Sequence, residues 1–63
     1  MLRKDVLHIL ETYPIGHTPA DLVLRINGEL GRIYEQREIA NELESLANEG
    51  TVARDGASYR ISR

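Results

Sequence analysis

Arg37 and Asn41 carry polar side chains four residues apart, within a segment of helical periodicity that runs from residue 35 to residue 49. At about 100° per residue, both fall on the stripe opposite the apolar residues Ile39 and Leu43. Arginine can donate two hydrogen bonds to the edge of a guanine, and asparagine can pair bidentately with adenine. The stripe therefore carries groups suited to contacting bases, although the same residues also fit an ordinary solvated surface.

The sequence offers little for catalysis or metal binding. His8 and His17 lie apart, no cysteine is present, and no pair of histidines shares one helix face, whereas zinc sites need several such ligands at close spacing. No Ser–His–Asp grouping, glycine-rich phosphate loop or cofactor fingerprint appears. We therefore expect a protein that is not an enzyme and that uses neither a cofactor nor a metal.

The composition sets the remaining bounds. The 63 residues are expected to form one domain, residues 1–63, and a core this small gives modest stability. The net charge of −2 lacks the overall basic character of many nucleic-acid-binding proteins. The chain has no cysteine and no apolar run long enough for a signal peptide or a membrane span, so the expected setting is the reducing cytoplasm.

Apolar residues at helical spacing predict a first helix over residues 2–12 and a third over residues 35–49. Pro14 ends the first, because its ring cannot continue the hydrogen-bond ladder. Gly50 ends the third, because glycine best tolerates the left-handed conformation just past a helix. Residues 15–17 are expected to be a connector or a very short strand.

The second helix has a clear start. Thr18 suits the N-cap, Pro19 suits the first helical position, and Asp21 follows the cap by three residues. A break is then predicted from Asn27, Gly28 and Gly31.

Two short runs rich in β-forming residues flank Asp55 and Gly56, which predicts a hairpin that turns at these two residues. This turn sets Arg54 opposite Ala57 and Val52 opposite Tyr59. The inward face is then Val52, Tyr59 and Ile61, and the outward face is Thr51, Ala53, Ser58 and Arg60. The expected core comprises Leu2, Val6, Ile9, Leu10, Leu22, Val23, Ile26, Ile39, Leu43, Leu46, Val52, Tyr59 and Ile61.

Three helices followed by a hairpin resemble a winged-helix domain, an α+β fold in which a three-helix bundle carries a C-terminal β-hairpin, the wing. The segment Leu46–Arg54, LANEGTVAR, resembles the L-x-x-x-G-x-[VI]-x-R joint between recognition helix and wing in MarR-like regulators. Residues 59–61, YRI, resemble their second wing strand. Glu42 departs from the pattern, because MarR-like and GntR-like domains usually carry a small or apolar residue there.

The resemblance implies a DNA-binding transcriptional regulator, in which the third helix enters the major groove of double-stranded DNA and the wing contacts an adjacent groove or the backbone. Residues 50–63 carry Arg54, Arg60 and Arg63 against Asp55, a net charge of +2 that suits phosphate contact. The same arginines also suit protection of an edge strand. The expected DNA-contacting residues are Thr18, Gln36, Arg37, Asn41, Arg54, Ser58 and Arg60.

The glutamates of residues 35–49 favour a different function. Five glutamates stand against one arginine, a net charge of −4, and four of the five gather on one flank of the helix. Glu38 and Glu42 repel each other at i,i+4 spacing, so a basic partner is expected. That partner is either within the chain (Arg3, Lys4, Arg25 or Arg32) or on another protein.

The alternative function is therefore a winged-helix module that binds a protein. Leu7 and Leu24 are expected to be exposed, because both fall off the buried stripes of their helices. A second copy of the chain, which would contact Leu7, Leu24 and the turn residue Tyr34, is an alternative partner, since DNA readers often pair to read two half-sites. The expected partner-binding residues are Leu7, Leu24, Glu38 and Glu42.

Overall fold

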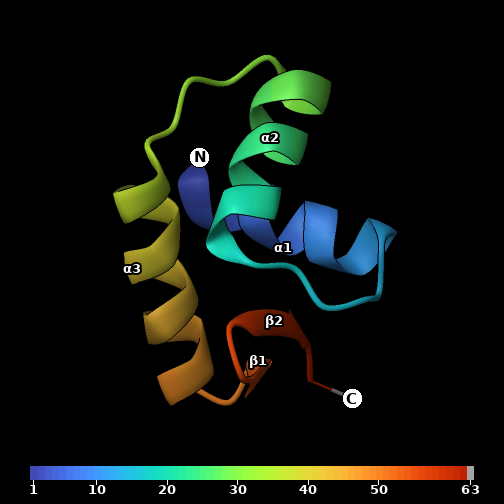
Figure 1. Cartoon of the computed structure of the whole chain (residues 1–63), viewed down its shortest axis with the longest axis vertical. Helices are drawn as coiled ribbons and strands as arrows, with labels where there is room; N and C mark the ends of the chain where they lie inside the picture. Colours follow the sequence, from blue (N-terminus) through green and yellow to red (C-terminus); the bar gives the residue numbers. More distant parts are fainter. Residues whose placement is uncertain (63) are drawn as a thin grey trace.

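A computed structural model describes residues 1–62 and contains three helices followed by a two-stranded antiparallel hairpin (Figure 1). The elements are α1 (Leu2–Thr12), α2 (Pro19–Leu30), α3 (Gln36–Asn48), β1 (Val52–Asp55) and β2 (Ser58–Ile61). Helix α1 contacts both other helices and β2, and α3 leads directly into β1, so the hairpin closes one end of the helical bundle. The predicted α+β layout, a three-helix bundle with a C-terminal wing, is confirmed.

Helix α2 begins as predicted, and only the last of the three predicted break residues ends it. The Thr18 hydroxyl accepts from the Asp21 amide at 3.1 Å, and the Asp21 carboxylate accepts from the Thr18 amide at 3.2 Å. The predicted break is confirmed at Gly31, where the helix ends with φ 64°, but it is wrong at Asn27 and Gly28, because the helix continues through both to Leu30. The Asn27 side chain hydrogen-bonds to the backbone of Tyr34, which lies beyond the helix. These bonds stabilise the last turns of the helix, although asparagine has a low intrinsic helix propensity.

Helix α3 lies within one residue of its predicted bounds at each end. Glu35 precedes it as the N-cap, and the Glu38 carboxylate accepts from the Glu35 amide at 3.2 Å. The helix ends at Asn48, and Gly50 adopts φ 83°, the left-handed conformation expected there.

The hairpin turns one residue later than predicted. Gly56 and Ala57 form the loop, Asp55 pairs with Ser58, and Val52 pairs with Ile61. The reason is that only Gly56 takes a positive φ, 64°, whereas a turn at Asp55 would require a positive φ at an aspartate. Each residue of β1 therefore pairs with a β2 residue two positions later than predicted. Because side chains alternate between the two faces with a period of two, the residues on the inward face are the same as predicted.

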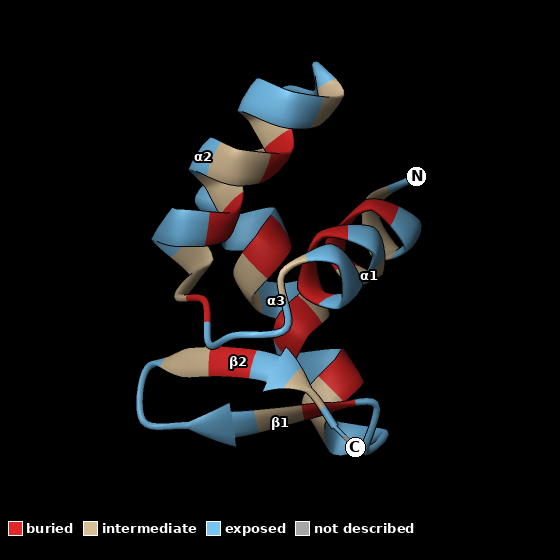
Figure 2. Ribbon diagram, turned by 90° about the vertical axis from the view of Figure 1, so that its right-hand side faces the viewer, coloured by how far each residue is buried: buried red, intermediate tan, exposed pale blue. Residues whose placement is uncertain are grey.

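The connector before α2 adds one further bridge to the sheet. His17 donates its amide to the Tyr59 carbonyl at 2.8 Å and accepts from the Tyr59 amide at 2.8 Å. Of the two alternatives expected for residues 15–17, the structure has a connector, which meets the sheet through the single bridge at His17 and forms no strand of its own. Strand β2 therefore lies between β1 and the connector (Figure 2).

The apolar core lies between the three helices and the inward face of the hairpin. Every fully buried apolar residue in residues 1–62 belongs to the predicted core, whereas Leu2, Val23 and Ile61 are only partly buried. The fully buried set is Val6, Ile9, Leu10, Leu22, Ile26, Ile39, Leu43, Leu46, Val52 and Tyr59. Asp5 and His17 are buried polar residues that the sequence patterns did not predict.

Candidate nucleic-acid interface

The surface of α3 that faces away from the core carries the predicted base-contacting groups. We call Arg37, Asn41, Glu44 and Asn48 the outward stripe, and all four are exposed, as is Gln36. They lie opposite the buried side chains of Ile39, Leu43 and Leu46. Within residues 1–62, Arg37 takes part in no ion pair. Its guanidinium is therefore available to an external acceptor.

Arg3 on α1 pairs with two carboxylates, that of Glu42 in α3 and that of Glu49, the C-cap residue that follows the helix. Its Nε donates to Glu42 at 2.6 Å, and its two terminal nitrogens donate to Glu49, each at 2.9 Å. The hydrogen bond from Arg3 lowers the pKa of Glu49, and the same contacts raise the pKa of Arg3. The expectation of a basic partner within the chain is confirmed for Glu42. These two carboxylates are held on the flank beside α1, and only Glu44 lies within the outward stripe.

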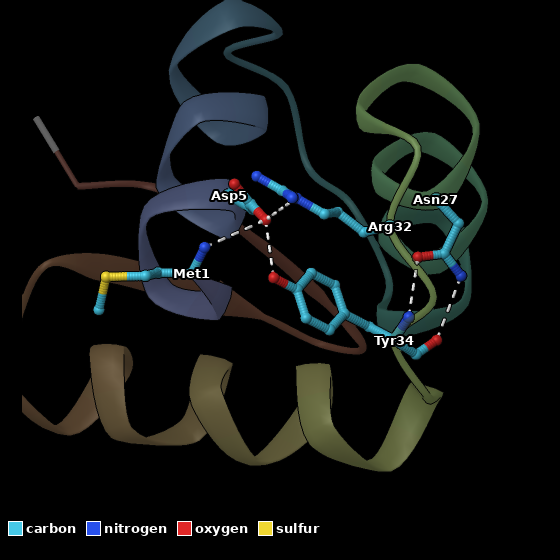
Figure 3. Close-up of polar contacts among 5 residues, drawn as sticks. All are labelled: Met1, Asp5, Asn27, Arg32 and Tyr34. Carbon is cyan, nitrogen blue, oxygen red and sulfur yellow. Dashed lines mark hydrogen bonds and ion pairs between the residues drawn. The ribbon is translucent and has the colours of Figure 1, made fainter.

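A polar cluster centred on Asp5 fixes the loop that leads into α3 (Figure 3). The phenol of Tyr34 donates to the Asp5 carboxylate at 2.7 Å, and Arg32 Nε donates to the same oxygen at 3.0 Å. The amino group of Met1 lies 3.8 Å from that oxygen. Asp5 is 8% exposed, and a carboxylate this buried requires such partners.

The contacts of Asp5 also set its charge. The hydrogen bond from Tyr34 is the main cause that holds the pKa of Asp5 below its ordinary value, against the opposing effect of burial, and the nearby charge of Arg32 adds to it. The same hydrogen bond raises the pKa of Tyr34. Asp5 is therefore a stable carboxylate that ties α1 to the α2–α3 loop.

Asn27 holds the same loop from α2. Its Nδ2 donates to the Tyr34 carbonyl, and its Oδ1 accepts from the Tyr34 amide, both at 3.1 Å. We call Asp5, Asn27, Arg32 and Tyr34 the Asp5 cluster; it fixes the chain one residue before the N-cap of α3. One feature of the sequence could have indicated this cluster: Asp5 is an aspartate on the apolar stripe of α1, between Leu2 and Ile9.

The wing presents its arginines to solvent. Arg54 and Arg60 are both exposed, and Arg54 donates from Nε to the Gly56 carbonyl at 3.1 Å. The guanidinium of Arg54 lies 5.9 Å from the centre of the Tyr59 ring. Ser58 is half-buried beside the loop, and Arg63, the third arginine expected in the wing, lies outside the described residues. The structure thus places two cationic side chains of the wing on its accessible surface.

The predicted partner-binding residues are divided by the structure. Leu24 is 76% exposed, as expected, but Leu7 is half-buried and packs against the core, so its expected exposure is wrong. The reason is that the apolar face of α1 is wider than a single stripe, since α1 contacts α2, α3 and β2. Ile15 and Ile33, 58% and 95% exposed, were missed.

Further findings bear on the class of protein. Comparisons with protein-family models, curated proteins and solved structures give no significant match. Within residues 1–62, no three histidine, cysteine or carboxylate side chains come together as a metal site. In the same residues, no helix has the length and apolar character needed to cross a membrane.

Proposed function

We propose that this chain is a small winged-helix protein that binds double-stranded DNA as a transcriptional regulator. In this proposal α3 lies in the major groove and the wing contacts the phosphate backbone. The observation that carries the proposal is the outward stripe: Arg37 and Asn41 are exposed and available, while Glu42 and Glu49 are held by Arg3 on another flank. The supporting fold is an α+β layout in which such a helix and wing are adjacent.

The available charges set the strength of this binding. Arg37, Arg54 and Arg60 are the exposed cations on α3 and the wing within residues 1–62. If each neutralises one phosphate, the slope of log K against log salt is about −3. Glu44 lies in the outward stripe and opposes close contact. We therefore expect weak binding that falls steeply with salt.

The test is a titration of fluorescently labelled duplex DNA of mixed sequence, followed by anisotropy from about 20 to 200 mM salt. Arg60→Ala should weaken binding to all sequences and reduce the slope by about 1. Lys4→Ala is the matched control, because Lys4 is an exposed cation on α1 that is no part of the proposed interface. Absence of binding at the lowest salt would reject the proposal, as would equal effects of the two substitutions.

A protein-binding module is the second candidate function, and the exposure of Leu24 favours it. Glu38 and the exposed surface of α2 would then contact a protein. In this case the wild-type chain fails to bind DNA at any salt. In both cases we propose a cytoplasmic binding protein that is not an enzyme and needs no cofactor.

A further inference from the structure

Two exposed apolar side chains share one concave surface beside α2. Leu24 projects from α2, Ile15 comes from the connector before it, and they are 76% and 58% exposed. Both line a hollow of about 490 Å³, which we call the α2 hollow. Its wall also includes His17, Asp21, Arg25 and Glu29. Single exposed apolar residues are ordinary, but two that line the same concavity are typical of a contact surface.

Charged residues run along α2 next to Leu24. Asp21, Arg25 and Glu29 follow one another at four-residue spacing, so they form one stripe with alternating sign. Arg25 is held in place, because it lies 3.2 Å from Glu29 and 3.9 Å above the centre of the Tyr13 ring. Two carboxylates against one guanidinium disfavour contact with the phosphates of DNA. A protein surface with matching charges therefore suits the α2 hollow better than DNA does.

We infer that a second copy of this chain docks at the α2 hollow and forms a two-fold symmetric dimer. An antiparallel copy of α2 centred on residue 23 sets Asp21 of each copy against Arg25 of the other. The two Leu24 side chains then lie on either side of the two-fold axis, about 3 Å apart along the helix direction at the rise of an α-helix. A two-fold contact must use one patch that complements itself. The α2 hollow meets that condition in both charge and apolar character, and the inference does not rest on DNA binding.

The first test is the mass of the chain in solution. Sedimentation equilibrium from roughly 10 μM to 1 mM covers the range in which small interfaces associate. The mass should rise with concentration from that of one chain, 7.1 kDa, toward twice that value. Leu24→Ser should weaken dimerisation about tenfold or more. Ile33→Ser is the matched control, because it removes an apolar side chain that is 95% exposed and outside the hollow.

The second test locates the contact. The sequence has no cysteine, so Leu24→Cys and Ile33→Cys each introduce one thiol. Leu24→Cys should form a disulfide-linked dimer under mild oxidation, and Ile33→Cys should form it only at the rate of random collision. Circular dichroism should show that every variant remains folded.

Three results would overturn the inference. One is a wild-type chain that stays monomeric at about 1 mM, which is the weakest association of interest; a different protein would then be the partner at the hollow. The others are a dimer that survives Leu24→Ser unchanged, and equal rates of cross-linking for the two cysteine variants.

Discussion

The substitution Asn27→Ala has two opposite effects on stability: it raises the helix propensity of α2, and it removes the hydrogen bonds that hold the α2–α3 loop. Alanine is the better helix former, and by propensity alone the substitution should stabilise α2 by about 0.6 kcal/mol. It also removes two hydrogen bonds to the backbone of Tyr34, both of 3.1 Å. Each such bond contributes about 0.5–1.5 kcal/mol net, so their loss costs about 1–3 kcal/mol. The balance is a destabilisation of about 0.5–2.5 kcal/mol.

The assay is thermal and urea unfolding followed by circular dichroism. A loss near 1.5 kcal/mol should lower Tm by about 6–12 °C in a domain of this size. Asn41→Ala is the matched control, because Asn41 is an exposed residue inside α3 whose side chain makes no hydrogen bond to residues 1–62. This control should be as stable as the wild type or slightly more stable. If Asn27→Ala behaves like the control, the hydrogen bonds to Tyr34 do not hold the loop and our account of the Asp5 cluster is wrong.

The other predictions concern the core, one glycine and the buried carboxylate. Leu43→Ala should cost about 2–5 kcal/mol, because Leu43 is fully buried, and an unchanged urea midpoint would contradict the assigned core. Gly28→Ala should stabilise the fold by about 0.5–1 kcal/mol, because Gly28 lies inside α2 and an added Cβ meets no atom within 4 Å; a lower Tm would contradict this. The pKa of Asp5 is lowered on folding, so its contribution is present above about pH 4 and is lost as the pH falls through the folded value. Tyr34→Phe removes the main cause of that shift, so the stability difference from the wild type should shrink in acid, and a difference constant from pH 7 to about pH 2.5 would contradict the assignment.

Local signals predicted the elements whose causes are local. The capping pattern at Thr18 and the stop at Gly50 depend on residues within one or two turns of each other, and both appear where the sequence places them. The apolar stripes identified the core for the same reason, since periodicity reports which side of a helix is buried. The fold class followed from the order of these elements.

Contacts between distant residues account for what the sequence did not predict. Asn27 has a helix-breaking preference, but its bonds to Tyr34 override that preference. Asp5 is buried because partners 27 and 29 residues away approach it. The position of the hairpin turn depended on which of two adjacent residues takes the positive φ, and glycine rather than aspartate does so.

The candidate interface was predicted only in part. Exposure of Arg37 and Asn41 followed from the helical wheel. Arg3 pairs with Glu42 and Glu49 and so neutralises two of the carboxylates on and just after α3. Arg3 was one of four basic residues that could have done so, and helical periodicity does not indicate which of them comes close. Base contact itself stays a prediction.

Whether α3 reads bases can be tested by selecting bound sequences from randomised duplex DNA with three proteins: the wild type, Arg37→Ala and Arg60→Ala. Arg37 lies in the outward stripe of α3, where a bidentate contact to guanine gives about 1–3 kcal/mol of discrimination between bases. Arg60 lies on the exposed face of the wing, where a phosphate contact carries no sequence information. Circular dichroism should first establish that all three proteins are folded.

We expect the wild type to enrich a short motif and Arg37→Ala to lose the preference at one position of that motif. Arg60→Ala should keep the motif but bind every sequence more weakly. The opposite pattern, in which Arg60→Ala erases the motif while Arg37→Ala weakens all sequences equally, would show that α3 does not read the DNA.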